Sequence, residues 1–158
     1  MQTPSVSVIV AVLDEAANID HVIDTALGDP RVIEVTIADG GSTDGTRDLV
    51  LDRSRTDDRV RLIDNPDRGQ SAGLNRAAFA SSGDILVRLD GHSTYAPDYI
   101  TASVDRVDKE TAVGGPMVAS GTGPWARATA GAMADPLAIG PARFHHATTV
   151  EEVDTVYL

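Results

Sequence analysis

The chain has 158 residues, of which 13 are basic and 24 acidic, so that its formal net charge is −11. This length fits one domain with its own core, and 42% hydrophobic residues is ordinary for a folded globular protein. Such a negative surface repels nucleic acid and anionic lipid, so we expect neither as a partner, although adaptation to salt would give the same acidity. The absence of cysteine excludes disulfides, thiolate metal sites and thiol nucleophiles, and it fits a reducing compartment.

The two ends of the chain carry information of their own. The N-terminus lacks the basic start and cleavage site of a signal peptide, and its apolar run is far shorter than the ~20 residues of a membrane span. We therefore predict no membrane segment in this chain and a cytoplasmic protein, with the inner face of the membrane as the alternative setting of the full-length protein. The chain stops within an apolar run at D-T-V-Y-L, so we expect residues 1–158 to be a single domain, truncated at its C-terminal end.

The first half of the chain alternates strand and helix patterns with short connections. Residues 6–12 form a β-branched run typical of a buried strand, and a helix follows over 19–27, stopped by Gly28. A second strand is predicted over 32–38, and a short helix over 46–55.

The same alternation continues into the second half. A short third strand over 60–63 precedes a helix over 71–82, for which Gly83 is the expected C-terminal stop. A fourth strand covers 85–89, and Pro97 is placed in the first turn of the next helix. This order predicts an α/β fold with a mainly parallel sheet and helices on both faces.

Beyond residue 111 the pattern loosens. V-G-G-P-M-V at 113–118 predicts a further strand, whereas 121–139 is rich in Gly and Ala and carries no predicted element.

Two predicted strands end in acidic loops. The first loop reads A-D-G-G-S-T-D-G-T and contains Asp39, and the second reads L-D-G-H-S and contains Asp90. In open α/β sheets, ligands bind outside the carboxyl ends of the strands. Crowded carboxylates repel one another unless a metal ion or several donors lie among them. The pattern therefore points to a nucleotide diphosphate that carries a divalent cation.

The Asp39 loop admits two interpretations. A strand-end Asp can accept an N–H from a base, or it can simply cap the following helix, for which Ser42, Thr43 and Asp44 are also good N-cap types. The chain has neither G-x-G-x-x-G nor G-K-[ST], which excludes the dinucleotide fingerprint and the P-loop.

Asp90 and His92 are candidate metal ligands, with Gly91 leaving room between them. A carboxylate with an imidazole suits manganese, whereas magnesium prefers oxygen alone, so we expect Mn²⁺ over Mg²⁺. A D-x-H sequence also occurs by chance in many proteins. His145 and His146 would complete a metal site or are surface or packing residues.

Two further residues are candidate ligand contacts. Arg68 lies just before a helix whose free N–H groups and dipole attract anions, so it is a candidate phosphate contact. Glu15 follows the first strand, and it either reaches the ligand or favours the first turn of the next helix.

Taken together and in this order, the motifs resemble glycosyltransferase family 2, inverting sugar transferases with the GT-A fold, a Rossmann-like sheet. The resemblance rests on V-S-V-I-V-A-V-L-D-E-A-A-N-I, A-D-G-G-S-T-D-G-T, R-G-Q-S-A-G-L-N-R-A-A-F-A-S-S-G-D-I-L and R-L-D-G-H-S, within about the first hundred residues. The later stretch resembles bacterial exopolysaccharide-type transferases.

The resemblance implies a donor site. Ala11, Leu13 and Glu15 would line the nucleotide pocket. Asp39 would hydrogen-bond the base, typically uracil, and Asp90 would lie near the ribose and the metal-bound diphosphate.

Two positions depart from the family's pattern. The last position of the family's D-x-D falls on His92, which would act as a metal ligand together with Asp90. Gln70 stands where many members carry a basic residue, with Arg68 close by.

The implied reaction transfers a sugar from a nucleotide-diphospho-sugar, UDP-linked, to a hydroxyl of a growing polysaccharide or lipid-linked glycan. The family's catalytic base belongs to a later acidic motif, and only Asp154 and the pair Glu151 and Glu152 offer late carboxylates, with a solvated acidic turn as their alternative. We therefore expect the base beyond Leu158, and donor binding with weak or absent transfer in this chain.

Three other interpretations stay open. The first is a non-catalytic nucleotide-sugar-binding module. The second is a nucleotidyltransferase, whose usual Gly-rich loop with Arg and Lys is missing from V-L-D-E-A-A-N-I. The third is a purely structural α/β domain.

Overall fold

The computed structural model describes residues 3–108, 111–116, 118–135, 138 and 153. The chain divides into two compact units, Met1–Ala102 and Ser103–Leu158. A single truncated domain over 1–158 stays a prediction.

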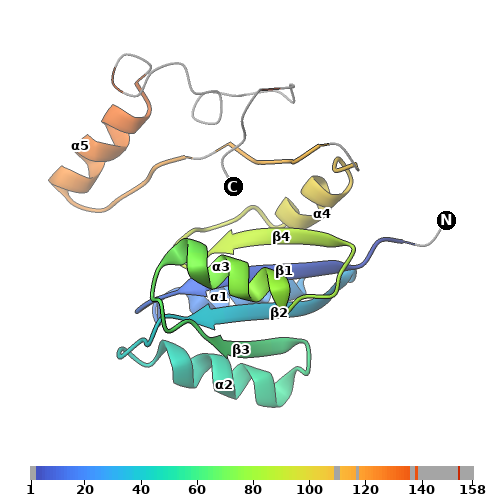
Figure 1. Ribbon diagram of the computed structural model, residues 1–158. Helices are drawn as coiled ribbons and strands as arrows, with labels where there is room; N and C mark the ends of the chain where they lie inside the picture. The colour runs from blue at the N-terminus through green and yellow to red at the C-terminus, as the bar shows by residue number, and fades with distance from the viewer. Residues whose placement is uncertain (1–2, 109–110, 117, 136–137, 139–152, 154–158) are drawn as a thin grey trace. The chain divides into compact units, whose positions relative to one another are not determined.

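The first unit contains a four-stranded parallel sheet, as the strand and helix alternation predicted. Its strands are β1 (Val6–Val12), β2 (Val32–Asp39), β3 (Val60–Asp64) and β4 (Ile85–Asp90), in the order β3-β2-β1-β4 (Figure 1). Each of the last three strands runs one residue further than predicted, and that extra residue is an Asp in every case.

A helix follows each strand along the chain. These helices are α1 (Ile19–Leu27), α2 (Thr46–Thr56), α3 (Gln70–Phe79) and α4 (Tyr99–Val104), and α5 (Pro124–Met133) belongs to the second unit. α4 begins two residues after Pro97, where the sequence placed the first turn. α1 buries the apolar stripe that its spacing predicted, and Ile19, Val22 and Ile23 are fully buried.

The strand order decides which helix covers which face. The chain moves outward from β1 to β2 and β3, and α3 then brings it back to the other side of β1. Because parallel crossovers are right-handed, this reversal puts α1 and α2 on one face and α3 on the opposite face (Figure 1). The direction in which successive strands are added thus reverses between β1 and β4. In open α/β sheets, ligands bind in the crevice at such a switch point.

β1 is the centre of the core. Val6, Val8 and Val10 have no exposed surface, as expected for a strand covered on both faces. On the α3 face, Ile9 and Ala77 are buried in one cluster to which Leu74 and Ala78 also belong, so the inward face predicted for this helix is confirmed.

Gly83 has a different role from the predicted helix stop. α3 ends at Phe79 and its C-cap is Ala80 in the right-handed helical conformation, so the sequence prediction was wrong. A Cβ on Gly83 would lie 2.6 Å from both the backbone nitrogen and Oγ of Ser7. The glycine is therefore required by the close approach of the chain to β1.

The second unit differs most from the sequence predictions. The described residues of the 113–118 segment form no strand, which fits two glycines and a proline that weaken β-pairing. The Gly/Ala-rich stretch contains α5, which was not predicted, and Pro124 lies in its first turn. Within the part of the chain that the structure describes, no helix has the length and apolar character to cross a bilayer.

Candidate functional site

Three strands deliver carboxylates to one edge of the sheet. In the strand register Asp39 lies beside Val12 on one side and Asp64 on the other, and Asp90 lies beside Ala11. Asp39 and Asp90 were predicted from the sequence as site residues, whereas Asp64 was not. The signal was present, because V-R-L-I-D is a third apolar strand that ends in Asp.

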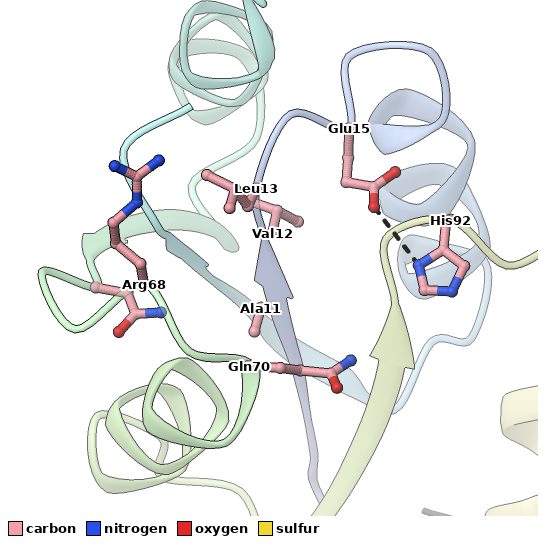
Figure 2. A pocket seen from close by; sticks show the side chains of 8 residues that line it. Ala11, Val12, Leu13, Glu15, Arg68, Gln70 and His92 are labelled. Atoms are coloured by element: carbon pink, nitrogen blue, oxygen red, sulfur yellow. Dashed lines mark ion pairs between the residues drawn. The ribbon is translucent and has the colours of Figure 1, made fainter. Parts of the chain in front are cut away.

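A first cleft of about 320 Å³ opens at the end of β1. It brings together five residues that the sequence predicted for the site, and its lining consists of Ala11, Val12, Leu13, Glu15, Asn65, Arg68, Gln70 and His92 (Figure 2). Five of the predicted donor-site residues thus come from three separate segments of the chain and meet at this cleft, whereas Asp39 and Asp90 do not line it.

Glu15 and His92 face each other in the first cleft. Glu15 Oε1 lies 3.5 Å from His92 Nδ1, and Arg68 lies across the end of β1 from this pair (Figure 2). A Cβ on Gly91 would lie 3.1 Å from both Glu15 Cγ and Val12 Cγ1, so the room that Gly91 leaves is used by Glu15. The structure therefore places Glu15 beside the imidazole.

Asp90 is held by three donors. Its Oδ1 accepts hydrogen bonds from Gln70 Nε2 at 3.1 Å and from Arg88 Nε and Nη2 at 3.1 and 2.7 Å. Its backbone N–H donates to the Tyr95 hydroxyl at 2.5 Å, and burial raises the pKa of Tyr95. The Asp90 carboxylate is thus balanced by the charge of Arg88 and does not line the first cleft, although Gln70, which donates to it, does.

A second cleft of about 400 Å³ adjoins the first. It is lined by Asp39, Gly40, Gly41, Arg47, Asp64, Asn65, Pro66 and Arg68. Asn65 and Arg68 line both clefts, so they form the wall between them.

Asp39 uses its carboxylate to hold its own loop. It accepts hydrogen bonds from the backbone N–H of Gly41 at 3.1 Å and of Ser42 at 3.2 Å, and Arg47 Nη1 lies 3.3 Å away. The side chain is fully buried. The Asp39 carboxylate therefore holds its own loop and does not cap the helix that follows, and its contact with a base stays a prediction.

The following helix begins differently from the N-cap prediction. The N-cap of α2 is Gly45, whose φ of 100° is in the left-handed region, and the N–H of Thr46, the first residue of α2, donates to Asp44 Oδ1 at 3.0 Å. Asp44 also accepts from the Thr46 hydroxyl at 2.6 Å and from the Ala16 N–H at 2.9 Å. These bonds, led by that of the Thr46 hydroxyl, lower the pKa of Asp44 and tie the loops after β1 and β2 together.

The wall between the clefts has two unusual features. Arg68 has a φ of 58°, in the left-handed region that a non-glycine residue rarely adopts. Asn65 Nδ2 donates to the Gly69 carbonyl at 3.0 Å, whereas its buried Oδ1 has no hydrogen-bond partner in the described part of the chain. The turn thus holds Arg68 in place at a cost in backbone strain.

The side chains near the first cleft suit a divalent metal ion only if the bound nucleotide supplies further oxygen ligands. Among the described residues, no three His, Cys, Asp or Glu side chains are grouped as a metal site. His92 is 66% exposed in the first cleft and turns Nδ1 toward Glu15, which leaves Nε2 as a metal donor. An imidazole with carboxylates nearby suits an intermediate metal such as manganese.

The remaining sequence candidates lie outside the described residues. These are His145 and His146, proposed as a further metal ligand, and the late acidic residues Glu151, Glu152 and Asp154.

A parallel sheet with clefts at its switch point defines the class of open α/β proteins that bind ligands at the carboxyl ends of their strands. Within that class the structure has the GT-A fold, since its structural neighbours are GT-A glycosyltransferases. The chain belongs to glycosyl transferase family 2, whose family model matches residues 7–150. Membership confirms the resemblance found in the sequence and weighs against a nucleotidyltransferase or a purely structural domain.

The chain is similar to curated proteins of polysaccharide and glycan synthesis. It is 40% identical over 102 residues to the succinoglycan biosynthesis protein ExoA of Rhizobium meliloti, covering 62% of this chain and 31% of that protein. It is 32% identical over 108 residues to the glycosyltransferase AglE of Haloferax volcanii, covering 66% and 36%. The chain thus spans about a third of the length of these relatives.

Solved structures agree with this assignment. The mannosyltransferase PcManGT of Pyrobaculum calidifontis, in complex with GDP-Man and Mn²⁺, matches with a TM-score of 0.63 and 28% identity over 74% of this chain and 36% of that chain. Glucosyl-3-phosphoglycerate synthase of Mycobacterium tuberculosis, in complex with Mn²⁺, UDP and glucosyl-3-phosphoglycerate, matches with a TM-score of 0.55 and 28% identity, covering 65% and 39%.

Proposed function

We propose that this chain is the donor-binding part of a glycosyltransferase of bacterial exopolysaccharide or glycan synthesis. The whole protein would transfer a sugar from a nucleotide-diphospho-sugar, UDP-linked, to a hydroxyl of a glycan or lipid-linked acceptor. The observation that carries this proposal is the first cleft, where Ala11, Leu13, Glu15, Arg68 and His92 meet in a chain of this family.

The two clefts suit different parts of the donor nucleotide. The first cleft suits the ribose and diphosphate, because Ala11 and Leu13 form an apolar wall and Arg68 offers a charged fork to phosphate oxygens. The second cleft, which Asp39 lines, suits the base. Arg68 stands between them, where the diphosphate and the base join through the ribose.

We assign the metal ion to His92 and Asp90, with Mn²⁺ preferred over Mg²⁺. Two of the similar structures hold Mn²⁺, one with GDP-Man and one with UDP, which supports a metal bound together with a nucleotide. When bound, such an ion stabilises the negative charge of the departing diphosphate. Glu15, 3.5 Å from His92 Nδ1, would orient the imidazole so that Nε2 faces the ion.

The transfer itself would be an inverting displacement. A general base takes the proton of the acceptor hydroxyl, whose oxygen forms the new bond to the anomeric carbon while the bond to the diphosphate breaks. We place that base beyond Leu158. The cytoplasm, or the inner face of the membrane for the whole protein, is the proposed location, since nucleotide sugars are the donors there.

The alternative is a non-catalytic nucleotide-sugar-binding module, which would show the same two clefts. The two candidates differ in a longer protein, because only the enzyme would turn over a nucleotide sugar.

The test is a calorimetric titration of UDP into the protein with and without Mn²⁺, on the wild type and on His92→Ala. We expect binding that Mn²⁺ strengthens, and a loss of that Mn²⁺ effect in the variant. His21→Ala is the matched control, because His21 is exposed on α1 and lines neither cleft. If neither UDP nor GDP binds under any condition, the proposal is wrong.

A further inference from the structure

The turn between β3 and α3 is closed by one residue, Asn65. Its Nδ2 donates to the Gly69 carbonyl at 3.0 Å, and its backbone carbonyl accepts from the Arg68 N–H at 3.0 Å. The Asn65 N–H also donates to the Asp39 carbonyl at 2.8 Å. Asn65 therefore ties both ends of the turn together and fixes the turn to the end of β2.

Packing holds the Asn65 amide in this orientation. The residue is 2% exposed, and a Cβ on Gly73 of α3 would lie 2.8 Å from Asn65 Nδ2 and 2.9 Å from Ala11 Cβ. Since the Gly69 carbonyl can only accept a hydrogen bond, the amide nitrogen must face it. The amide therefore keeps its nitrogen toward Gly69 and has no room to move toward α3.

The oxygen of the same amide is left without a partner. Asn65 Oδ1 is buried and accepts no hydrogen bond in the described part of the chain, which costs stability. Because most buried polar atoms in folded proteins are paired, this cost indicates that the side chain serves more than folding. Its Nδ2 bond indicates what else it serves, since that bond closes the turn that contains Arg68.

Arg68 is the strained residue of this turn. Its φ of 58° is in the left-handed region, which residues other than glycine rarely adopt, whereas the neighbouring Gly69 has an ordinary φ of −74°. The strain therefore falls on the arginine although a glycine stands next to it. Such strain persists only where surrounding contacts enforce it, and the Asn65 hydrogen bonds are such contacts.

The Arg68 guanidinium is available to a ligand. Arg47 and Arg88 are paired with carboxylates, whereas in the part of the chain that the structure describes the Arg68 side chain has no ion pair or hydrogen bond. Arg68 also lines both clefts. On the proposed function, on which this inference rests, the backbone of the turn thus decides where this guanidinium meets the donor nucleotide.

We propose that Asn65 is a positioning residue for donor binding. By closing its turn, it holds Arg68 in the left-handed conformation that presents the guanidinium to both clefts. Asn65 acts through Arg68 and needs no contact of its own with the nucleotide. It was not predicted from the sequence as a site residue, because its bond to Gly69 exists only in the folded turn.

The test is a double-mutant cycle, measured by calorimetric titration of UDP in the presence of Mn²⁺. Asn65→Ala should weaken UDP binding about tenfold, because the turn relaxes and the guanidinium moves away from the ligand. Arg68→Gly keeps the turn but removes the guanidinium, so it should weaken UDP by a similar factor. In the Arg68→Gly background, Asn65→Ala should then cost no further affinity. A merely structural role of Asn65 would weaken UDP by the same factor in both backgrounds, which would overturn the inference.

Stability gives a second readout, which does not depend on the folding of Asn65→Ala. Glycine adopts a positive φ without strain, and we expect this relief to exceed the entropy that glycine adds to the unfolded chain. Arg68→Gly should therefore raise the urea midpoint while it weakens UDP. Asn75→Ala and Arg76→Ala are the matched controls, since both residues are exposed on α3 and line neither cleft, and they should leave UDP binding unchanged.

The possible failures are distinguishable. If the wild type binds UDP and Arg68→Gly binds it equally well, or unfolds at a lower urea midpoint, this inference is wrong while the proposed function stands. If the wild type prefers GDP, the same cycle is measured with GDP. If neither nucleotide binds the wild type, the proposed function fails and this inference fails with it.

Discussion

Asp39 shows how a strand-end carboxylate can serve its own loop. The backbone N–H groups of Gly41 and Ser42 point at it, and Arg47 covers it. A buried acceptor with three donors contributes to stability, because each partner would otherwise be left unsatisfied on folding. Asp39, which the sequence marks most strongly as a candidate ligand contact, thus also stabilises the loop that follows β2.

Replacing Asp39 by Asn should therefore lower stability. The amide keeps the size but removes the charge and turns one acceptor into a donor facing N–H groups, which we expect to cost about 1–3 kcal/mol. Urea unfolding measures this loss. Asp52→Asn, at an exposed residue of α2, is the control. An unchanged urea midpoint would contradict the loop-holding role.

Glu15 is expected to act through His92. Glu15→Gln keeps the packing against Gly91 but replaces the carboxylate that faces Nδ1, so we expect about tenfold weaker Mn²⁺ binding in the presence of UDP. Manganese titration by electron paramagnetic resonance measures the affinity, and ¹⁵N shifts of His92 report its tautomer.

A direct nucleotide contact of Glu15 would give a different pattern. UDP binding without metal would then fall as much as binding with Mn²⁺, and the His92 tautomer would not change. Asp20→Asn, on α1, serves as the control because Asp20 is exposed and lines neither cleft.

At the scale of secondary structure, the connections decide how closely the elements approach. The turn between α3 and β4 passes over β1, where Gly83 donates its N–H to Ser7 Oγ at 2.8 Å. Nearby, Glu34 accepts from the Ser7 hydroxyl at 2.6 Å and from the Ser82 N–H at 2.5 Å. Burial opposes these bonds, but together with the Arg61 charge they outweigh it and lower the pKa of Glu34.

Gly83→Ala should destabilise the protein by about 1–3 kcal/mol, because the new Cβ would overlap backbone atoms of β1 that cannot move freely. Urea unfolding measures the change. Gly131→Ala in α5 is the matched control: its Cβ would meet no atom within 4 Å, and alanine favours helix. An equally small effect of both substitutions would refute the role of Gly83 in packing.

Two connections share one D-x-R pattern that predicts acid sensitivity. Asp29 before β2 and Asp57 before β3 each accept hydrogen bonds from the N–H, Nε and Nη2 of the Arg two residues later. The Arg59 hydrogen bonds lower the pKa of Asp57 to about 2, and Arg31 lowers the pKa of Asp29 further.

Because both folded pKa values lie below the unfolded value of about 4, the stabilisation is complete above that pH. It is lost as the pH falls from about 4 toward 2. Thermal unfolding between pH 7 and pH 2 should show this decline, and Asp57→Asn and Arg59→Gln should each reduce it. A decline that both variants leave intact would contradict the assignment.

At the scale of the whole molecule, the chain contains the two clefts of the proposed donor site but spans about a third of the length of its relatives. The two clefts lie within Met1–Ala102, and their lining comes from four segments of that unit. The proposed donor binding can therefore be tested separately from the proposed sugar transfer.

We expect the 158-residue chain to bind UDP without transferring sugar. Incubation with UDP-sugars, Mn²⁺ and a glycan acceptor should release no UDP above the rate without acceptor, whereas a longer protein containing the later acidic motif should. Acceptor-dependent turnover by the 158-residue chain would show that the base lies before Leu158.

The sequence by itself determined the elements of the first unit and the family to which the chain belongs. Strand and helix periods are local properties, so β1 to β4 and α1 to α3 were placed within a few residues. The motifs carrying Asp39 and Asp90 were visible because each follows an apolar run directly. The second unit was predicted poorly, since a Gly/Ala-rich stretch has no clear period.

Only the tertiary structure decided how these residues meet. The order β3-β2-β1-β4 sets Asp64 beside Asp39 and lets Arg47 bridge them, a relation between strands and a helix that no local spacing records. It also shows that Asp39 accepts hydrogen bonds from its own loop, and that Gly83 allows the chain to approach β1 closely. The physical reason is that register, burial and hydrogen-bond satisfaction depend on contacts between segments far apart in the chain.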